Sequence, residues 1–110
     1  MAKIGTKAKY AWPAIKKTLE DKKSDSTIRY QLIRAAALLA KDQPEAVPLL
    51  AELALHDEAA ENRLAAVQEL GELGPAGTPA VPALTRIADG DARASLRQAA
   101  EAALKKIKGS

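Results

Sequence analysis

Apolar residues recur along the chain at the spacing of one face of an α-helix. This spacing predicts helices over residues 8–21, 26–41, 44–55, 58–73, 78–88 and 92–108. Trp12, Ile15 and Leu19 mark the inner face of the first helix, and Ile28 and Leu32 mark that of the second. No segment shows the two-residue alternation of a half-buried strand, so the sequence predicts an all-α fold.

One stretch, LGPAGTPAVPAL at residues 73–84, combines a helix end, a Gly/Pro corner and the start of the next helix. Copies of it occupy residues 4–15 and 39–50, at steps of 35 and 34 residues. A fixed step of this length is typical of stacked helical repeats. We therefore expect one domain, an α-solenoid of about three helical hairpins with units at about residues 4–39, 40–73 and 74–108.

The last helix differs from its two counterparts along one stripe. Gln98, Glu101 and Lys105 stand where the earlier repeats carry apolar residues or glycine. A terminal helix of a solenoid needs a polar outer face, because no further repeat covers it. The stripe therefore predicts a cap at the C-terminal end.

The N-terminal end carries less of such a polar stripe. Ile4-Gly5 aligns with Leu73-Gly74, which predicts a helix end near residue 5 and earlier repeats in a longer parent protein. Pro13 then falls near the first turn of the next helix, where a missing N–H costs little. Trp12 remains apolar at this end, either as part of the core or as a partly exposed contact for a partner or a second copy.

Composition limits the chemistry of the chain. Apolar residues make up 47% and aromatic residues 3%, so the core consists mainly of Ala, Leu, Ile and Val. Cysteine is absent, which excludes disulfides and thiolate metal sites. No apolar run is long enough for a membrane span and no signal-peptide pattern is visible, so we expect a cytoplasmic protein.

Charge is segregated along the chain. Residues 1–41 carry ten Lys or Arg and three Asp or Glu, residues 42–90 carry two and nine, and residues 91–110 carry five and two. The net charge of +3 hides this pattern. The simpler interpretation of this segregation is that the charged residues lie on solvated helix faces. The alternative is that a partner recognises the change in the sign of the charge along the array.

The repeated motif resembles HEAT repeats, specifically the short kind found in phycocyanobilin lyases. Two copies carry it, Asp57…Arg63-Leu64-Ala65-Ala66…Leu70…Leu73-Gly74…Ala80-Val81-Pro82 and Asp91…Leu96-Arg97…Leu104…Ile107. The resemblance implies a ladder between repeats, formed by an Asp and the Arg six residues on. Arg29, Arg63, Arg97, Asp57 and Asp91 match it, although Lys23 replaces the Asp before Arg29. Anion binding is the alternative role for these arginines.

The sequence offers little for catalysis. His56 is the single histidine, so neither a Ser/His/Asp set nor a histidine metal site can be argued. The glycines at Gly74 and Gly77 lack the Gly-Lys-Ser/Thr ending of a phosphate loop. We expect no enzyme activity, no metal and no cofactor.

The resemblance implies a non-catalytic scaffold that binds another protein on a concave face lined by the second helix of each pair. The positions expected at this face and at the N-terminal end are Trp12, Lys16, Lys17, Glu20, Glu52, Leu55, Thr85, Arg86 and Asp89.

Three other partners stay open at this point. The apolar N-terminal end could mediate self-association. Lysines 3, 7, 9, 16, 17, 22 and 23 could bind a nucleic-acid backbone, but the acidic middle and the few aromatic residues argue against it. An accessory role in tetrapyrrole attachment is implied by the resemblance alone.

Overall fold

The computed structural model describes residues 3–109, and side chains from residue 11 onward. This part of the chain folds as helices joined by short corners, without strands. The helices are α1 (Lys3–Glu20), α2 (Ser26–Leu39), α3 (Ala46–His56), α4 (Ala60–Glu72), α5 (Val81–Gly90) and α6 (Ala94–Lys108), with a 3₁₀ helix, η1 (Gly74–Ala80), before α5.

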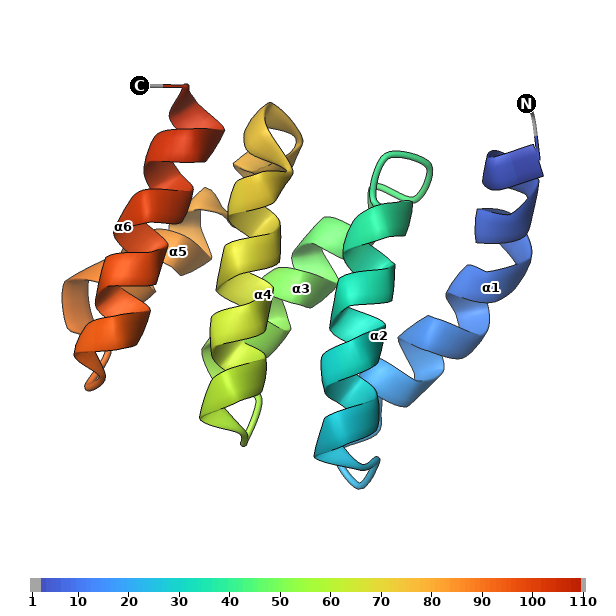
Figure 1. Ribbon diagram of the computed structural model, residues 1–110, viewed down its shortest axis with the longest axis horizontal. Helices are drawn as coiled ribbons and strands as arrows, with labels where there is room; N and C mark the ends of the chain where they lie inside the picture. The colour runs from blue at the N-terminus through green and yellow to red at the C-terminus, as the bar shows by residue number, and fades with distance from the viewer. Residues whose placement is uncertain (1–2, 110) are drawn as a thin grey trace.

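The helices form two layers of a flat body that measures 39 × 34 × 16 Å (Figure 1). In one layer α2, α4 and α6 stand side by side, and α3 and α5 lie behind them. Each helix of the second layer packs on the helix that follows it, so that α3 pairs with α4 and α5 pairs with α6. This arrangement is the α-solenoid that the repeat step predicts.

Small side chains bring the helices of the front layer close together. The largest fully buried residues are aliphatic, among them Ile33, Leu50 and Leu70. Gly71 of α4 faces α6 so closely that a Cβ added to it would lie 2.9 Å from the Cα of Ala103. Close approach of this kind explains why a core almost free of aromatic residues fills its volume.

Local signals set the ends of several helices. Asp25 caps α2, since its Oδ1 accepts hydrogen bonds from the Thr27 amide at 2.8 Å and the Ile28 amide at 3.3 Å. Gly74 ends α4 with φ of +60°, and Gly109 ends α6 with φ of +74°. Glycine adopts this left-handed backbone without steric penalty.

The prediction of a helix end at Ile4-Gly5 is wrong. Helix α1 runs without a break from Lys3 to Glu20, and Pro13 lies in its interior and not in its first turn. The helix is visibly bent (Figure 1), as expected where proline removes a hydrogen bond and its ring crowds the preceding turn. The sequences diverge after the glycine: Pro75 follows Gly74 and disfavours continued helix, whereas Thr6 follows Gly5.

Candidate functional site

A groove lies between the C-terminal end of α1 and the exposed side of α3. It encloses about 270 Å³. Its floor is apolar and consists of Leu19, Leu49 and Leu53. Its polar lining is Glu20, Lys22, Glu52, His56 and Glu58, with Arg29 and Asp57 at the base.

The groove exists because α1 does not pack along α3 in the way that α3 packs along α5. Within the described residues α3 packs along α5, whereas α1 packs mainly on α2. Leu49 is consequently half-buried, and Leu53 retains 8% of its exposure. The bent α1 therefore leaves part of the leucine face of α3 accessible.

The rim of the groove is predominantly acidic. Glu20, Glu52 and Glu58 are exposed, against the single exposed lysine Lys22. His56 Nε2 lies 4.0 Å from Oε2 of Glu52, which is one helical turn away, and both side chains are more than half exposed. The rim thus combines carboxylates with an apolar floor.

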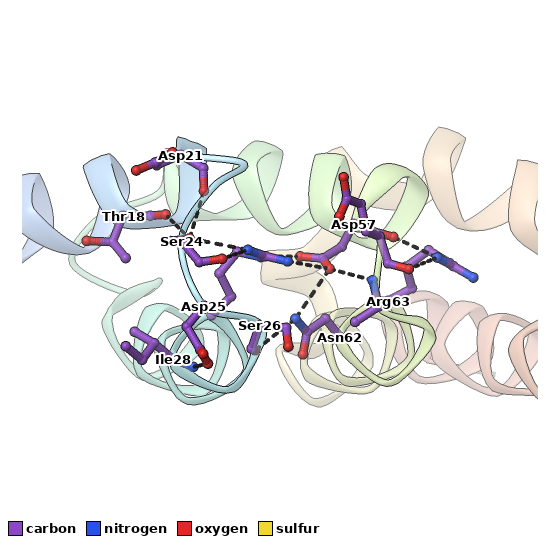
Figure 2. A network of polar contacts seen from close by, with 12 residues as sticks. Thr18, Asp21, Ser24, Asp25, Ser26, Ile28, Asp57, Asn62 and Arg63 are labelled. Atoms are coloured by element: carbon purple, nitrogen blue, oxygen red, sulfur yellow. Dashed lines mark hydrogen bonds and ion pairs between the residues drawn. The ribbon is translucent and has the colours of Figure 1, made fainter.

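A buried ion pair closes the base of the groove (Figure 2). Arg29 Nε donates to Asp57 Oδ2 at 2.9 Å, and Arg29 Nη2 donates to Oδ1 at 3.3 Å. The two residues keep only 5% and 7% of their exposure. Because Arg29 belongs to α2 and Asp57 caps the C-terminus of α3, the pair joins neighbouring repeats.

The surroundings of Asp57 favour its charged form. Burial alone would raise the pKa of this carboxyl, but the hydrogen bonds from Arg29, the Ala59 amide and Asn62 outweigh burial and hold the pKa below its ordinary value. The hydrogen bond to Asp57 in turn raises the pKa of the Arg29 guanidinium. The pair is therefore a fixed structural contact, with both charges satisfied.

Asn62 is part of this network, and the sequence analysis missed it. Its Nδ2 donates to the Ser26 carbonyl at 3.1 Å and to Asp57 Oδ1 at 3.3 Å, and its side chain is fully buried. Ile28 and Leu96 occupy the same column of the repeat, 34 residues before and after Asn62. The signal available in the sequence was one amide in an otherwise apolar column.

The arginines with the 34-residue step share another contact. Arg63 Nη1 donates to the Asp57 carbonyl at 2.6 Å, and Arg97 Nη1 donates to the Asp91 carbonyl at 2.7 Å. Arg29 Nη1 donates to the Ser24 carbonyl in the same way. Arg63 and Arg97 thus satisfy the C-cap carbonyls of α3 and α5, where helices leave acceptors unpaired, and Arg29 satisfies a carbonyl in the loop before α2.

The implied ladder is therefore present at one place only. Arg29 and Asp57 form its rung, whereas no ion pair joins Arg63 to Asp91 within the described part of the chain. Leu96 stands where Asn62 stands one repeat earlier, and it offers no amide to hold the Asp91 carboxylate. At the interface between α4 and α6 an apolar side chain takes this place, since Leu96 is buried and keeps only 1% of its exposure.

The structure separates the residues that the sequence grouped as partner-binding. Glu20 and Glu52 line the groove, and Trp12 is buried in the core with 3% of its exposure. Leu55 is half-buried. The remaining positions are exposed outside the groove, namely Lys16, Lys17, Thr85, Arg86 and Asp89.

The two ends of the array also differ in the structure. Gln98, Glu101 and Lys105 are exposed on α6. Towards the other end, the large apolar side chains that are exposed among those the structure describes belong to α2, where Ile28 keeps 52% and Leu38 keeps 82% of its exposure. Ile28 was predicted to point inward, and that prediction is wrong because its side chain lies on the side of α2 away from Asn62 and α4 (Figure 2).

Stacked helical hairpins, with an arginine fixed at the same place in each, define a helical-repeat protein. The family model for HEAT repeats matches residues 8–105, so the chain belongs to the HEAT repeat family. The match is to HEAT repeats in general and does not single out the phycocyanobilin lyase kind. Searches of curated proteins and of solved structures each found no match.

Two further findings bear on function. Among the described residues, no group of three or more His, Cys, Asp or Glu side chains is arranged to hold a metal ion. None of the helices in that part of the chain is long and apolar enough to cross a membrane.

Proposed function

We propose that this chain is a non-catalytic protein-interaction module whose groove between α1 and α3 binds an extended segment of another protein. HEAT repeats commonly mediate protein–protein interaction. The observation that carries the proposal is the accessible leucine floor beneath an acidic rim. A volume of about 270 Å³ is enough for one or two side chains of a bound peptide.

The lining indicates the chemistry of the bound segment. A lysine or arginine side chain can lay its aliphatic stem on Leu49 and Leu53 while its charge meets Glu52 or Glu20. Arginine suits this arrangement best, because its planar guanidinium bonds carboxylates through two donors. The proposed ligand is therefore a segment with a basic residue beside an aliphatic one.

Selection from a random peptide library tests this proposal. We expect enrichment of Arg or Lys next to Leu or Ile, and the enriched peptides should lose binding to the Glu52→Lys and Leu49→Glu variants. Arg86 occupies the position of Glu52 one repeat later and lies outside the groove, so Arg86→Glu is the matched control. Without such enrichment, or if binding survives both groove variants, another surface carries the interaction.

A nucleic-acid backbone is the weaker alternative. Lys16, Lys17, Lys22 and Lys23 are exposed, which gives the N-terminal part of the chain a basic surface. Glu20 and Asp21 are exposed among them and reduce its field. A salt-dependent gel-shift assay with duplex DNA and single-stranded RNA decides this alternative, and absence of binding at low salt eliminates it.

Self-association through the apolar N-terminal end would not use the residue that the sequence suggested. Trp12 is buried, so among the described side chains Ile28 and Leu38 on α2 are the ones that we propose a second copy would contact. Sedimentation velocity over a range of concentrations measures whether the chain forms such dimers.

A further inference from the structure

One side chain of the groove belongs to the residue type that changes charge near neutral pH. His56 is the single histidine of the chain, and it lies in the lining of the groove at the C-terminal end of α3. Histidine ordinarily gains its charge as pH falls from about 8 to about 5, whereas carboxylates, lysine and arginine ordinarily keep theirs over that range. The charge of the lining therefore depends on pH through this residue.

The imidazole lies beside a carboxylate that a bound basic segment would contact. His56 Nε2 is 4.0 Å from Oε2 of Glu52, which is too far for a hydrogen bond. Both side chains are more than half exposed, so a small rotation of either one closes this gap. While the imidazole is neutral, the Glu52 carboxylate is available to a ligand. Once the imidazole is charged, the two residues form an ion pair one turn apart on α3.

The charged groups at the base of the groove and behind it stay constant with pH. Arg29 of α2 and Asp57 form the buried pair at the base, and their charges cancel. Arg63 of α4 donates to the carbonyls of Asp57 and Glu58 from outside the lining. Because arginine keeps its charge throughout the physiological range, neither contact alters the charge of the groove between pH 7 and pH 5.5.

The exposed carboxylates of the lining outnumber its lysine. Glu20 of α1, Glu52 of α3 and Glu58 after α3 are exposed, and within the described residues no lysine or arginine pairs with them. Lys22, in the loop after α1, is the exposed lysine of the lining. Three negative charges and one positive charge leave a net charge of −2 when the imidazole is neutral, and a charged imidazole reduces it to −1.

Given the function proposed for the groove, we propose that protonation of His56 releases a basic segment from it. The charged imidazole draws Glu52 into an ion pair and repels the arginine or lysine that would otherwise meet this carboxylate. The groove therefore binds its basic partner near neutral pH and loses it as pH falls through the range in which histidine gains its charge. Exposed charge pairs contribute modestly, so the two effects together should weaken binding about threefold to tenfold.

Titration with a defined peptide at two pH values tests this switch. The probe is the acetylated and amidated tripeptide Leu-Arg-Leu, and amide chemical shifts of the ¹⁵N-labelled full chain report its binding. We expect shifts at Leu49 and Leu53 at pH 7.0 and an affinity about threefold to tenfold lower at pH 5.5. The same peptide with citrulline in place of arginine should bind equally at both pH values, because it carries no charge.

Two variants of His56 separate the charge of the side chain from its presence. His56→Gln stays neutral, so the affinities for the arginine peptide at pH 7.0 and pH 5.5 should become equal. His56→Lys is charged at both pH values, so binding should be weak at both. Because the His56 side chain is 59% exposed, both variants should fold normally, and circular dichroism checks this.

The outcomes distinguish this switch from the function on which it rests. If the peptide binds the groove at pH 7.0 and equally well at pH 5.5, the groove takes a basic segment but His56 does not control it. The same holds if His56→Gln retains the pH dependence. If the peptide shifts no groove residue at either pH, the proposed function fails and the switch fails with it.

Discussion

Asp57→Ala tests whether the network between repeats stabilises the array. The carboxylate accepts two hydrogen bonds from Arg29 and one from the Ala59 amide at 2.9 Å. It also accepts from Asn62. Truncation to alanine leaves the buried Arg29 guanidinium with Ser24 as its remaining acceptor residue.

The magnitude follows from the burial of both partners. Removal of one member of a buried ion pair costs about 3–5 kcal/mol, because the other charge stays buried without compensation. The contact of Arg29 with Ser24 places the expected loss near the lower limit, at about 3 kcal/mol. That is a large share of the roughly 5–15 kcal/mol by which a domain is usually stable.

Urea unfolding followed by circular dichroism measures this loss. Lys106→Ala is the control, because it removes an exposed inter-repeat pair with Glu72 and should cost less than about 1 kcal/mol. The double variant Arg29→Met with Asp57→Leu should regain much of the stability, since it leaves no unpaired charge. The reasoning is refuted if Asp57→Ala costs no more than the exposed control.

Two more predictions use the same unfolding assay. Gly71→Ala should destabilise the protein by about 1 kcal/mol, because the clash with Ala103 costs about 1–3 kcal/mol and the gain in helix propensity is about 1 kcal/mol. A net gain in the free energy of unfolding would contradict this prediction. The lowered pKa of Asp57 predicts that its stabilisation is complete above the ordinary carboxyl pKa and is lost as pH falls below that value through the folded-state pKa. Asp57→Asn should therefore lose less stability than the parent between about pH 4 and pH 2, and equal losses would argue against the assignment.

The helices and their stacking could be predicted from sequence because both depend on local pattern. Apolar spacing defines one face of each helix, and the glycines and prolines at residues 73–84 mark a corner that recurs. The family is visible for the same reason, since a motif repeated at a constant step is stronger than one copy. Burial of Leu84 and Ile107 follows directly from this pattern.

The groove and the exposure of Ile28 on α2 could not be predicted, because they depend on which helix covers which residue. Ile28, Asn62 and Leu96 share one column, yet one is half-exposed and two are buried. Sequence spacing describes the face of a helix, but the neighbour that covers it is a property of the assembled layers. The buried amide of Asn62 follows the same rule, since its acceptors lie on Ser26 and Asp57 of other segments.

Pro13 provides a direct comparison between the pattern of the sequence and the fold. The sequence aligns it with Pro48 and Pro82, which lie in the first turns of α3 and α5. The structure places it in the interior of α1, with its side chain exposed. An interior proline costs about 3 kcal/mol relative to alanine, whereas a proline in the first turn removes no helical hydrogen bond.

Pro13→Ala should therefore stabilise the protein by about 2 kcal/mol, after allowance of about 0.4–1 kcal/mol for the freer unfolded chain. Pro48→Ala is the matched control and should be neutral or slightly destabilising, because its missing N–H is one that helix starts leave unpaired. Urea midpoints and the circular dichroism signal at 222 nm measure stability and helix content together. If Pro13→Ala behaves like Pro48→Ala, then α1 begins at the proline in solution, and the bend that opens the groove is a helix start.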